Sequence, residues 1–437
     1  MDATLISLVL TAVIAVLLLG GLWVSLSLLA VGLVGMLLYT SAPAGTVMAT
    51  TIWGASGNWA LTSLPLFIWM AEILFRTRLS EDMFRGLAPW MSGLPGRLMH
   101  VNVVGCAIFS AVSGSNAATC ATIAKIALPE LQRRGYDDKM TIGSLTASGT
   151  LGILIPPSIL MIVYGFIAEV SIARLFIAGV IPGIVISALF MGYVIYWAWR
   201  YPHLTPPADV SETSMTIRER LWASRRLIPI TGLIVLVMGT IYGGIATPTE
   251  AATIGVLGAL ALCWIYGTLT WSSFVESLVG TMQTSCMIAF ILAGASFLTI
   301  ALGYTGVPKA AAALITSQQL GAYGLLTALT VLYIILGFAL DGISMVVLTS
   351  SVVQPMIRQA GIDPVWFGIY ITLLVQVAEL TPPVGFPMFV MQQMTGRSLT
   401  YVARASLPFF WLLIVGTAII IVWPALVTWL PDRMLNP

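Results

Sequence analysis

The chain of 437 residues is 59% hydrophobic and only 8% charged, whereas a soluble globular domain carries about 25% charged residues. These values exclude a soluble globular protein and indicate a chain that crosses a membrane several times. The net charge of +2, without a long basic tract, argues against nucleic acid as a partner.

The segment of residues 98–132 has polar features that a simple membrane span lacks. Arg97 precedes it, and Arg133 and Arg134 follow it. Because basic residues favour the cytoplasmic side of a membrane, both ends of the segment are expected on that side. Its middle, residues 113–116, reads Ser-Gly-Ser-Asn, which is typical of a turn. We therefore predict a re-entrant helical hairpin that enters and leaves the membrane on the same side.

The next apolar segment, residues 139–170, contains the double proline Pro156-Pro157. Proline has no backbone N–H and its ring clashes with the preceding helical turn, so nearby carbonyl groups lose their partners within the helix. We predict a transmembrane helix that is broken at this point and offers carbonyl oxygens to a ligand. The alternative interpretation is that the prolines merely kink a packed helix.

Residues 200–226 form the most polar linker and divide the chain into two halves, 1–199 and 227–437. The linker contains four arginines, Arg218, Arg220, Arg225 and Arg226, and is therefore predicted to be cytoplasmic. Two amphipathic stretches between spans, Leu79–Leu94 and Trp271–Met282, are expected to be short helices that lie on the membrane surface.

The second half repeats the features of the first at a nearly constant offset in the numbering. That offset is 226 between Pro129, Gly135, Asp137 and Pro156 and their respective counterparts, Pro355, Gly361, Asp363 and Pro382. The segment of residues 323–357 has Asp341 at its middle, where the offset from Ser113 is 228. We interpret this position as the equivalent of Ser113, displaced by a short indel. Residues 365–393 contain the second double proline, so a second hairpin and a second broken helix are predicted.

Each half is thus expected to cross the membrane five times and to hold one hairpin. Because five is odd, the second copy should lie upside down relative to the first. Arg397 and Arg404, after the second broken helix, would then be cytoplasmic, as basic residues should be. The predicted fold class is an all-α polytopic membrane protein, built as an inverted repeat with two re-entrant helical hairpins and two proline-broken transmembrane helices.

Common catalytic motifs are absent from the sequence. It contains no Walker lysine motif, no HExxH zinc motif and no GxSxG elbow, and its only histidines are His100 and His203. We expect a transporter rather than an enzyme, without an organic cofactor. An ion channel would need a ring of charge or a filter motif. A purely structural scaffold would not explain polar turns at membrane depth.

Oxygen atoms at the turns and breaks suit a small cation such as sodium. In the first half they come from Ser113, Ser115 and Asn116 at the turn and from the backbone of Gly149, Thr150, Ile155 and Pro156 at the break. In the second half they come from Asp341 and Ser344 at the turn and from Glu379, Thr381 and Pro382 at the break. We predict two sodium sites related by the repeat. Glu379 is a candidate for contact with either the ion or the substrate.

Several motifs resemble those of one transporter family. Residues 243–252, Gly-Gly-Ile-Ala-Thr-Pro-Thr-Glu-Ala-Ala, resemble the GG-x-x-TPTEAA signature of the DctM-type large membrane subunit of tripartite ATP-independent periplasmic (TRAP) transporters. Ser113–Thr119 and Gly152–Ser158 resemble the first hairpin turn and first break of that subunit, and Asp341–Met345 and Thr381–Gly385 resemble the second pair. The resemblance spans essentially the whole chain.

The resemblance implies a sodium-coupled, elevator-type importer of organic acids, such as C4-dicarboxylates or sialic acid, similar in fold to the ion transporter superfamily. It implies a multi-pass location in the bacterial inner membrane, while the number of crossings and the charge bias predict that both termini are periplasmic. The implied protein partners are a small four-helix membrane subunit and a periplasmic substrate-binding protein. The alternative is a stand-alone sodium- or proton-coupled anion transporter that needs no binding protein.

The resemblance also adds residues to the predicted sites. It extends the ion sites to Gly114, Gly342, Met345 and Gly385. It places the carboxylate substrate between the two turns, near Ser115, Asn116, Pro157, Ser344 and Pro383.

Overall fold

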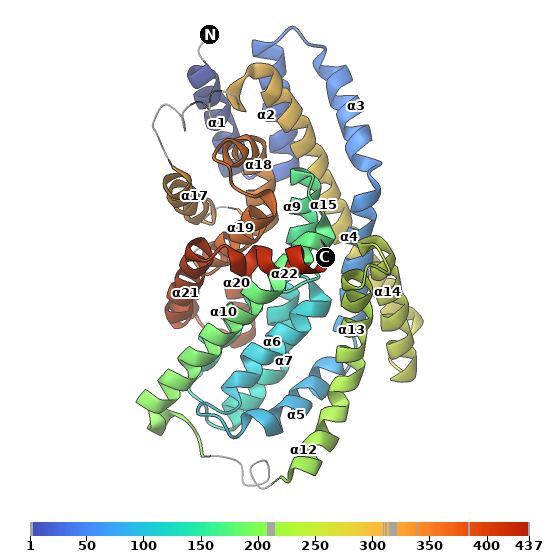
Figure 1. The fold of residues 1–437 in the computed structure, drawn as a ribbon, viewed down its shortest axis with the longest axis vertical. Helices are drawn as coiled ribbons and strands as arrows, with labels where there is room; N and C mark the ends of the chain where they lie inside the picture. The colour runs from blue at the N-terminus through green and yellow to red at the C-terminus, as the bar shows by residue number, and fades with distance from the viewer. Residues whose placement is uncertain are drawn as a thin grey trace.

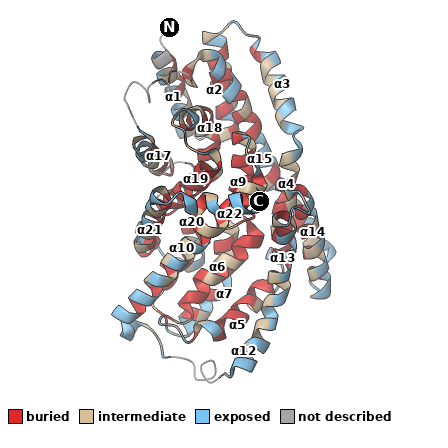
Figure 2. Ribbon diagram, in the orientation of Figure 1, coloured by how far each residue is buried: buried red, intermediate tan, exposed pale blue. Residues whose placement is uncertain are grey.

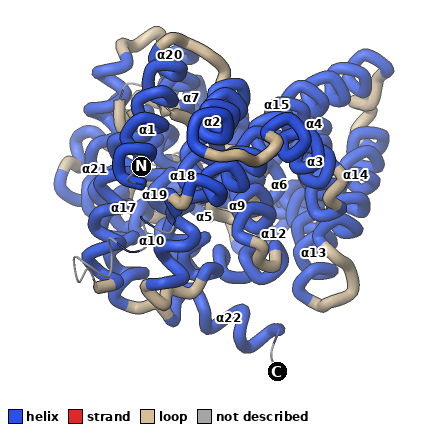
Figure 3. The backbone as a smooth tube through the Cα atoms, turned by 90° about the horizontal axis from the view of Figure 1, so that it is seen from above, coloured by secondary structure: helices blue, strands red, loops and turns tan. Residues whose placement is uncertain are grey.

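The computed structural model describes residues 3–207, 215–308, 310, 313, 321–338, 340–382 and 385–435. All regular secondary structure in these ranges is helical (Figure 3). Buried residues concentrate on the central helices, and exposed residues on the outer ones (Figure 2). The predicted all-α class is therefore confirmed for the described part of the chain.

An outer group of helices, which we call the scaffold, comes from the start of both halves. It consists of α1 (Ala3–Leu19), α2 (Val24–Tyr39), α3 (Ala44–Ser56), η1 (Trp59–Thr62), α4 (Ser63–Phe75), α13 (Ile228–Tyr242), α14 (Pro248–Ile265) and α15 (Trp271–Thr305). The long helix α15 packs along α2, α3 and α4, and α14 packs along α4. Figure 1 shows α3, α4, α13 and α14 along one side of the molecule.

The remaining helices form a second group that holds the turns and breaks. In the first half they are α5 (Leu79–Met91), α6 (Met99–Ser113), α7 (Asn116–Arg133), α8 (Asp138–Gly149), η2 (Thr150–Ile153), α9 (Ile159–Ala168) and α10 (Ile172–Arg200). In the second half they are α17 (Ala322–Leu336), α18 (Gly342–Gln359), α19 (Pro364–Glu379), α20 (Phe386–Thr395), α21 (Leu399–Val422) and α22 (Ala425–Leu435). The paired helices α6–α7 and α17–α18 occupy the segments in which the two hairpins are predicted.

Two parts of the scaffold differ from the prediction. The five crossings expected for the first half include none between Tyr39 and Ala60, because this stretch is taken as the connection between two spans. Instead, α3 occupies it and meets the following helix at a bend of 53°. The stretch from Trp271 is not a separate surface helix, because it continues without a break to Thr305. Ser277 is buried, whereas Trp271 on the apolar face and Ser272 and Glu276 on the polar face are all exposed.

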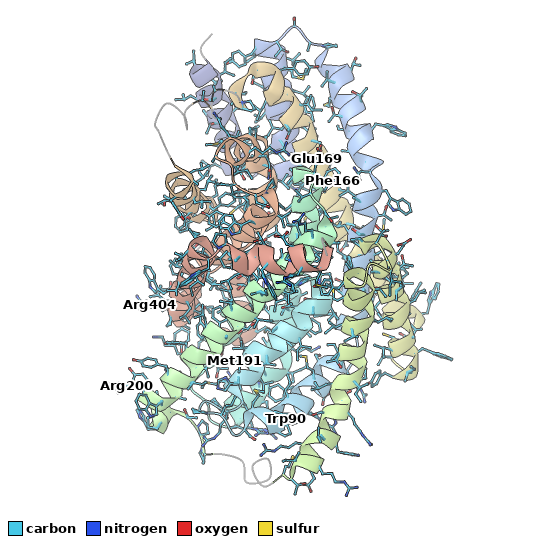
Figure 4. The ribbon with its side chains drawn as sticks, viewed as in Figure 1. Trp90, Phe166, Glu169, Met191, Arg200 and Arg404 are labelled. Carbon is cyan, nitrogen blue, oxygen red and sulfur yellow. The ribbon has the colours of Figure 1, made fainter. Side chains whose placement is uncertain are left out.

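The predicted linker is partly helical and is attached to the rest of the chain. It contains η3 (Pro202–Leu204), α12 (Ile217–Ala223) and η4 (Ser224–Leu227). The indole N–H of Trp90, on α5, donates a hydrogen bond of 2.7 Å to the hydroxyl of Ser224. Trp90 and Arg200 both lie toward the end of the molecule where the linker runs (Figure 4). The arginine-rich linker therefore marks this end of the molecule, as expected for one side of a membrane.

The two broken helices run in opposite directions. Near the end of α9, the hydroxyl of Tyr164 donates a hydrogen bond of 2.6 Å to the carbonyl of Pro364 at the start of α19. At the other end, Arg397, after α20, forms an ion pair of 2.8 Å with Asp138 at the start of α8. Each helix thus begins where the other ends, which is the arrangement that an inverted repeat requires.

Helix length and composition are those of a membrane protein. Five helices in the described part of the chain are long and apolar enough to cross a membrane, or six if the bent pair α3–α4 forms one span. The hairpin and broken helices consist of shorter apolar pieces. At about 1.5 Å per residue, such pieces are shorter than the hydrocarbon core of about 30 Å.

Candidate functional site

The first hairpin turn is closed by local hydrogen bonds. Gly114 has a φ of +60°, a conformation that glycine adopts without strain, and it ends α6. The hydroxyl of Ser115 caps α7 by accepting a hydrogen bond from the amide of Ala118. The hydroxyls of Ser113 and Thr119 lie 2.5 Å apart. The predicted residues Ser113 to Asn116 therefore form a compact turn with its polar atoms held in place.

This turn rests directly on the first helix break. The amide of Ile159, the first residue of α9, donates a hydrogen bond of 3.1 Å to the carbonyl of Gly114. A Cβ atom on Gly152 would lie only 2.4 Å from the carbonyl oxygen of Ser115. Ser158 caps α9 and its hydroxyl also donates to the carbonyl of Ile153, at 2.6 Å. The structure thus brings together the turn and the break from which the first ion site is predicted.

Not every predicted residue of the first site faces the turn with its side chain. The peptide bond between Pro156 and Pro157 is cis, and both prolines are buried. The side chains of Ile155 and Pro156 line an apolar cavity of about 610 Å³ between α6, α10 and α13, to which Met191 of α10 also contributes (Figure 4). Ile155 and Pro156 therefore have only their carbonyl oxygens to offer a cation. The hydroxyl of Thr150 donates to the carbonyl of Ala147, at 2.7 Å.

The second hairpin turn corrects the predicted register of the repeat. Asp341 caps α18 through hydrogen bonds from the amides of Ile343 and Ser344, at 3.1 and 3.2 Å, and it also accepts from the Ser344 hydroxyl. Its counterpart is the cap of α7, Ser115, at the same offset of 226 as the prolines. The assignment of Asp341 to the position of Ser113, with an indel, was wrong. The helix cap defines the equivalence, because each cap is the first residue before an inner hairpin helix.

The second break is also close to its turn. A Cβ atom on Gly342 would lie 3.2 Å from a carboxylate oxygen of Glu379, at the end of α19. The hydroxyl of Thr381 donates to the carbonyl of Ala378, at 2.5 Å. A Cβ on Gly385 would overlap the carbonyl oxygen of Glu379, at 1.8 Å, so only glycine fits there. The predicted residues Ser344 and Met345 are buried in the first turn of α18.

The double proline differs between the two breaks. Pro382 is exposed, unlike its buried counterpart Pro156. Pro383, predicted near the substrate, lies outside the described residues. The sequence suggests that the two breaks are equivalent. The structure shows that they differ in how far their first proline is buried.

The two half-sites meet through one pair of side chains. The side-chain amide of Asn116, the first residue of α7, donates a hydrogen bond to the carboxylate of Glu379, at a sequence separation of 263. Asn116 is 8% exposed and Glu379 is 5% exposed. Nearby, α7 packs on α20, and the Cys120 thiol lies 3.8 Å from the carbonyl of Pro387. The first turn thus contacts both its own break and the break of the other repeat.

One polar residue at this centre is missing from the sequence-based prediction. Gln376 is fully buried on α19, and neither its amide nitrogen nor its oxygen has a hydrogen-bond partner in the described part of the chain. It lies one helical turn before Glu379, so the two side chains share one face of the helix. The sequence does contain a signal for Gln376. It is a polar residue within an apolar segment, one helical turn before the candidate site residue Glu379.

The motif at residues 247–250 lies outside this centre and starts a helix. Thr247 caps α14 by accepting from the amide of Glu250, and the Glu250 carboxylate accepts from the amide of Thr247 at 2.8 Å. Pro248 occupies the first helical position, where its missing N–H costs nothing. The Thr-Pro-Thr-Glu sequence is thus a capping box.

Comparison with known proteins agrees with the resemblance in the sequence motifs. The family model described as "Tripartite ATP-independent periplasmic transporter, DctM component" matches residues 11–426. The C4-dicarboxylate TRAP transporter large permease protein DctM of Pseudomonas aeruginosa is 30% identical over 386 residues, covering 88% of this chain and 89% of that protein. The ectoine TRAP transporter large permease protein TeaC of Halomonas elongata is 32% identical over 376 residues, covering 85% and 86%.

A third relative and one solved structure extend the comparison. The sialic acid TRAP transporter large permease protein SiaM of Vibrio cholerae is 28% identical and covers 96% of this chain and 97% of that protein. The crystal structure of the YdaH transporter of Alcanivorax borkumensis superposes with a TM-score of 0.66, covering 96% of this chain and 99% of that chain. At 14% identity, that structure shows similarity of fold alone. The names of the three relatives as permeases confirm the expectation of a transporter rather than an enzyme.

Proposed function

The chain belongs to the DctM family, the large permease subunit of tripartite ATP-independent periplasmic transporters, and from this premise we propose that it is a sodium-coupled importer of an organic solute. It is a membrane-embedded protein, and we place it in the bacterial inner membrane with both termini periplasmic. Its relatives carry C4-dicarboxylates, ectoine or sialic acid in their names, which supports a small carboxylate as the cargo.

The observation that carries this proposal is the docking of each hairpin turn on a helix break. The Gly114 carbonyl is bonded to Ile159, and Gly342 lies against Glu379. Backbone at such turns and breaks is not consumed by regular helical bonding, so its oxygens are available to a cation. A hydroxyl that donates its hydrogen, as Thr150 and Thr381 do, still has lone pairs to offer an ion.

We assign the first sodium site to the first turn and its break. Its members are Ser113, Gly114, Ser115, Gly149, Thr150, Ile155 and Pro156. The side chain of Asn116, which the sequence also suggests for this site, donates to Glu379 instead. We assign the second to Asp341, Gly342, Ser344, Met345, Thr381, Pro382 and Gly385. The Glu379 carboxylate, which the sequence also suggests for the second site, lies beside Gly342 and accepts a hydrogen bond from Asn116 of the other repeat. An ionised Asp341 has about four lone-pair positions, so capping of α18 leaves room for an ion.

Sodium entry supplies the driving force in this proposal. Each ion that moves inward gains about 2.3 kcal/mol per 100 mV of membrane potential, before its concentration gradient is counted. Two ions therefore suffice to drive a singly charged carboxylate inward. We further propose an elevator movement, in which the group with the turns and breaks moves against the scaffold. The antiparallel broken helices supply the two related arrangements that such a movement needs.

Two partner proteins complete the proposed system. A small four-helix membrane subunit and a periplasmic substrate-binding protein would join this chain, the latter delivering the solute. Exposed tryptophans on the scaffold, such as Trp53 on α3 and Trp264 on α14, suit contact with lipid or with another membrane subunit.

Binding of radiolabelled sodium to the purified chain tests the ion sites. We expect saturable binding that potassium does not displace and that Ser113→Ala and Asp341→Asn each weaken. Ser56→Ala is the matched control, because its hydroxyl bonds the carbonyl of Ile52 on α3, outside the site. Sodium binding that neither site variant changes would contradict the assignment. Uptake by the purified chain alone in liposomes would favour the stand-alone alternative.

A further inference from the structure

The pair formed by Asn116 and Glu379 breaks the symmetry of the repeat. At the offset of 226, Asn116 corresponds to Gly342 and Glu379 corresponds to Ile153. In the other copy of the repeat, the equivalent contact would join Gly342 to Ile153, and neither residue has a polar side chain. A contact needed only to hold the repeats together would be expected twice. A buried polar pair that occurs in only one of the two equivalent positions points to a role toward a ligand.

Glu379 lacks a positively charged partner in the described part of the chain. The arginines there that form ion pairs do so with other carboxylates, such as Glu72, Glu130, Asp138 and Asp432. Lys125, the basic residue on the same hairpin helix as Asn116, is exposed. A buried carboxylate without a cation is costly, and one amide donor offsets only part of that cost. A cationic group placed beside Glu379 would favour the ionised carboxylate and form a charge-assisted hydrogen bond with it.

The groups around Glu379 favour a nitrogen cation over a metal ion. Asn116 presents its N–H₂ group to Glu379, while its carbonyl oxygen accepts from the amide of Ala117, at 2.7 Å. Asn116 therefore contributes a donor here and not an oxygen ligand. Gln376, one helical turn away and fully buried, has both an unpartnered donor and an unpartnered acceptor among the described residues. This set matches the polar groups of an organic solute, whereas sodium prefers a shell of oxygens.

We propose that Glu379 binds a cationic nitrogen of the transported solute, so that the cargo is a zwitterion: a carboxylate that also carries an ammonium or amidinium group. Asn116 and Gln376 hydrogen-bond the same solute. This inference rests on the proposed function, and it moves Glu379 from the second ion site to the substrate. It makes a C4-dicarboxylate, with a second negative charge in place of the nitrogen, a poor cargo.

Thermal unfolding of the purified full-length chain in sodium buffer tests the proposal with matched pairs of probes. Each pair differs only in an ammonium or a carboxylate at one end: 3-aminopropanoate against succinate, and 4-aminobutanoate against glutarate. We expect a zwitterion to raise the unfolding temperature and its dicarboxylate partner to leave it unchanged. Glu379→Gln should weaken zwitterion binding about tenfold or more, because a buried charge-assisted bond is lost. The variant Glu379→Asp keeps the carboxylate and should therefore retain part of the affinity for the zwitterion.

Two controls separate this inference from the sodium sites. The variant Glu276→Gln loses an exposed carboxylate of α15, which lies near Arg76. This variant should bind the probes as the wild type does. Glu379→Gln should keep the sodium-dependent rise in unfolding temperature. Loss of that rise would make Glu379 an ion ligand and overturn the inference. Equal stabilisation by dicarboxylates, or none by either zwitterion, would also overturn it. If sodium does not raise the unfolding temperature of the wild-type chain, that result would instead count against the proposed function.

Discussion

Ser115 and Asp341 cap the two inner hairpin helices from equivalent positions, separated by the same offset of 226 that relates the rest of the repeat. This equivalence shows that Asp341 has a structural role, because its carboxylate caps the N-terminus of α18. A carboxylate that replaces a hydroxyl at such a cap also adds negative charge beside the second break. The proposed ion sites are therefore related in position but differ in charge.

Substitution of Asp341 separates its capping role from its proposed ion binding. Asparagine is as good a cap as aspartate, so Asp341→Asn should unfold at nearly the wild-type temperature in potassium buffer. Asp341→Ala should lose about 1 kcal/mol of stability with the cap. Both should bind sodium more weakly, as measured by the sodium-dependent shift in unfolding temperature. An undiminished shift in Asp341→Asn would remove Asp341 from the ion site.

A second prediction concerns the contact of the first turn with its break. Gly114→Ala would place a Cβ 2.9 Å from the carbonyl oxygen of Pro157, in a backbone conformation that disfavours alanine. We expect a loss of about 2 to 4 kcal/mol in thermal or denaturant unfolding. Gly135→Ala is the matched control, because Gly135 has a φ of +78° but open space around it. It should lose only about 1 to 2 kcal/mol. Equal losses would show that the close contact contributes nothing.

The Thr-Pro-Thr-Glu motif is predicted to act through stability rather than transport. Glu250→Ala or Thr247→Ala removes half of the capping box of α14 and should cost about 1 kcal/mol. Transport per folded molecule should not change. Thr216→Ala provides a comparison, since it removes the same kind of cap from α12 in the linker. A Glu250 variant that folds normally but transports nothing would contradict this structural role.

The antiparallel arrangement of the broken helices makes a prediction about labelling from each side of the membrane. Asp138→Cys and Arg397→Cys, whose native side chains form an ion pair, should react with an impermeant maleimide from the same side. Asp432→Cys, at the C-terminal helix α22 beside Arg174, should react from the opposite side. The background is Cys286→Ser, because Cys286 is the exposed cysteine. Labelling of Asp138→Cys and Arg397→Cys from opposite sides would refute the inverted repeat.

Much of the fold could be predicted because the features that interrupt a membrane helix are local. The turns at Ser113–Asn116 and Asp341–Ser344 and the break at Pro156 consist of turn-forming residues and proline, and helices of the structure end and begin at each of them. The prediction failed where local signals were weak. α3 was missed because its sequence is only moderately apolar, and the continuity of α15 across Gly280 was missed because an amphipathic stretch suggested a separate helix.

The sequence by itself determined that the chain lies in a membrane, that its two halves are related, and where its helices break, since composition, charge bias and proline act on their own neighbourhoods. Only the tertiary structure decided which turn meets which break, and that Asn116 reaches across to Glu379. It also revealed that Gln376 lies buried without a partner among the described residues. Contacts between residues so far apart in the chain depend on how two inverted repeats pack, and no local pattern encodes that geometry.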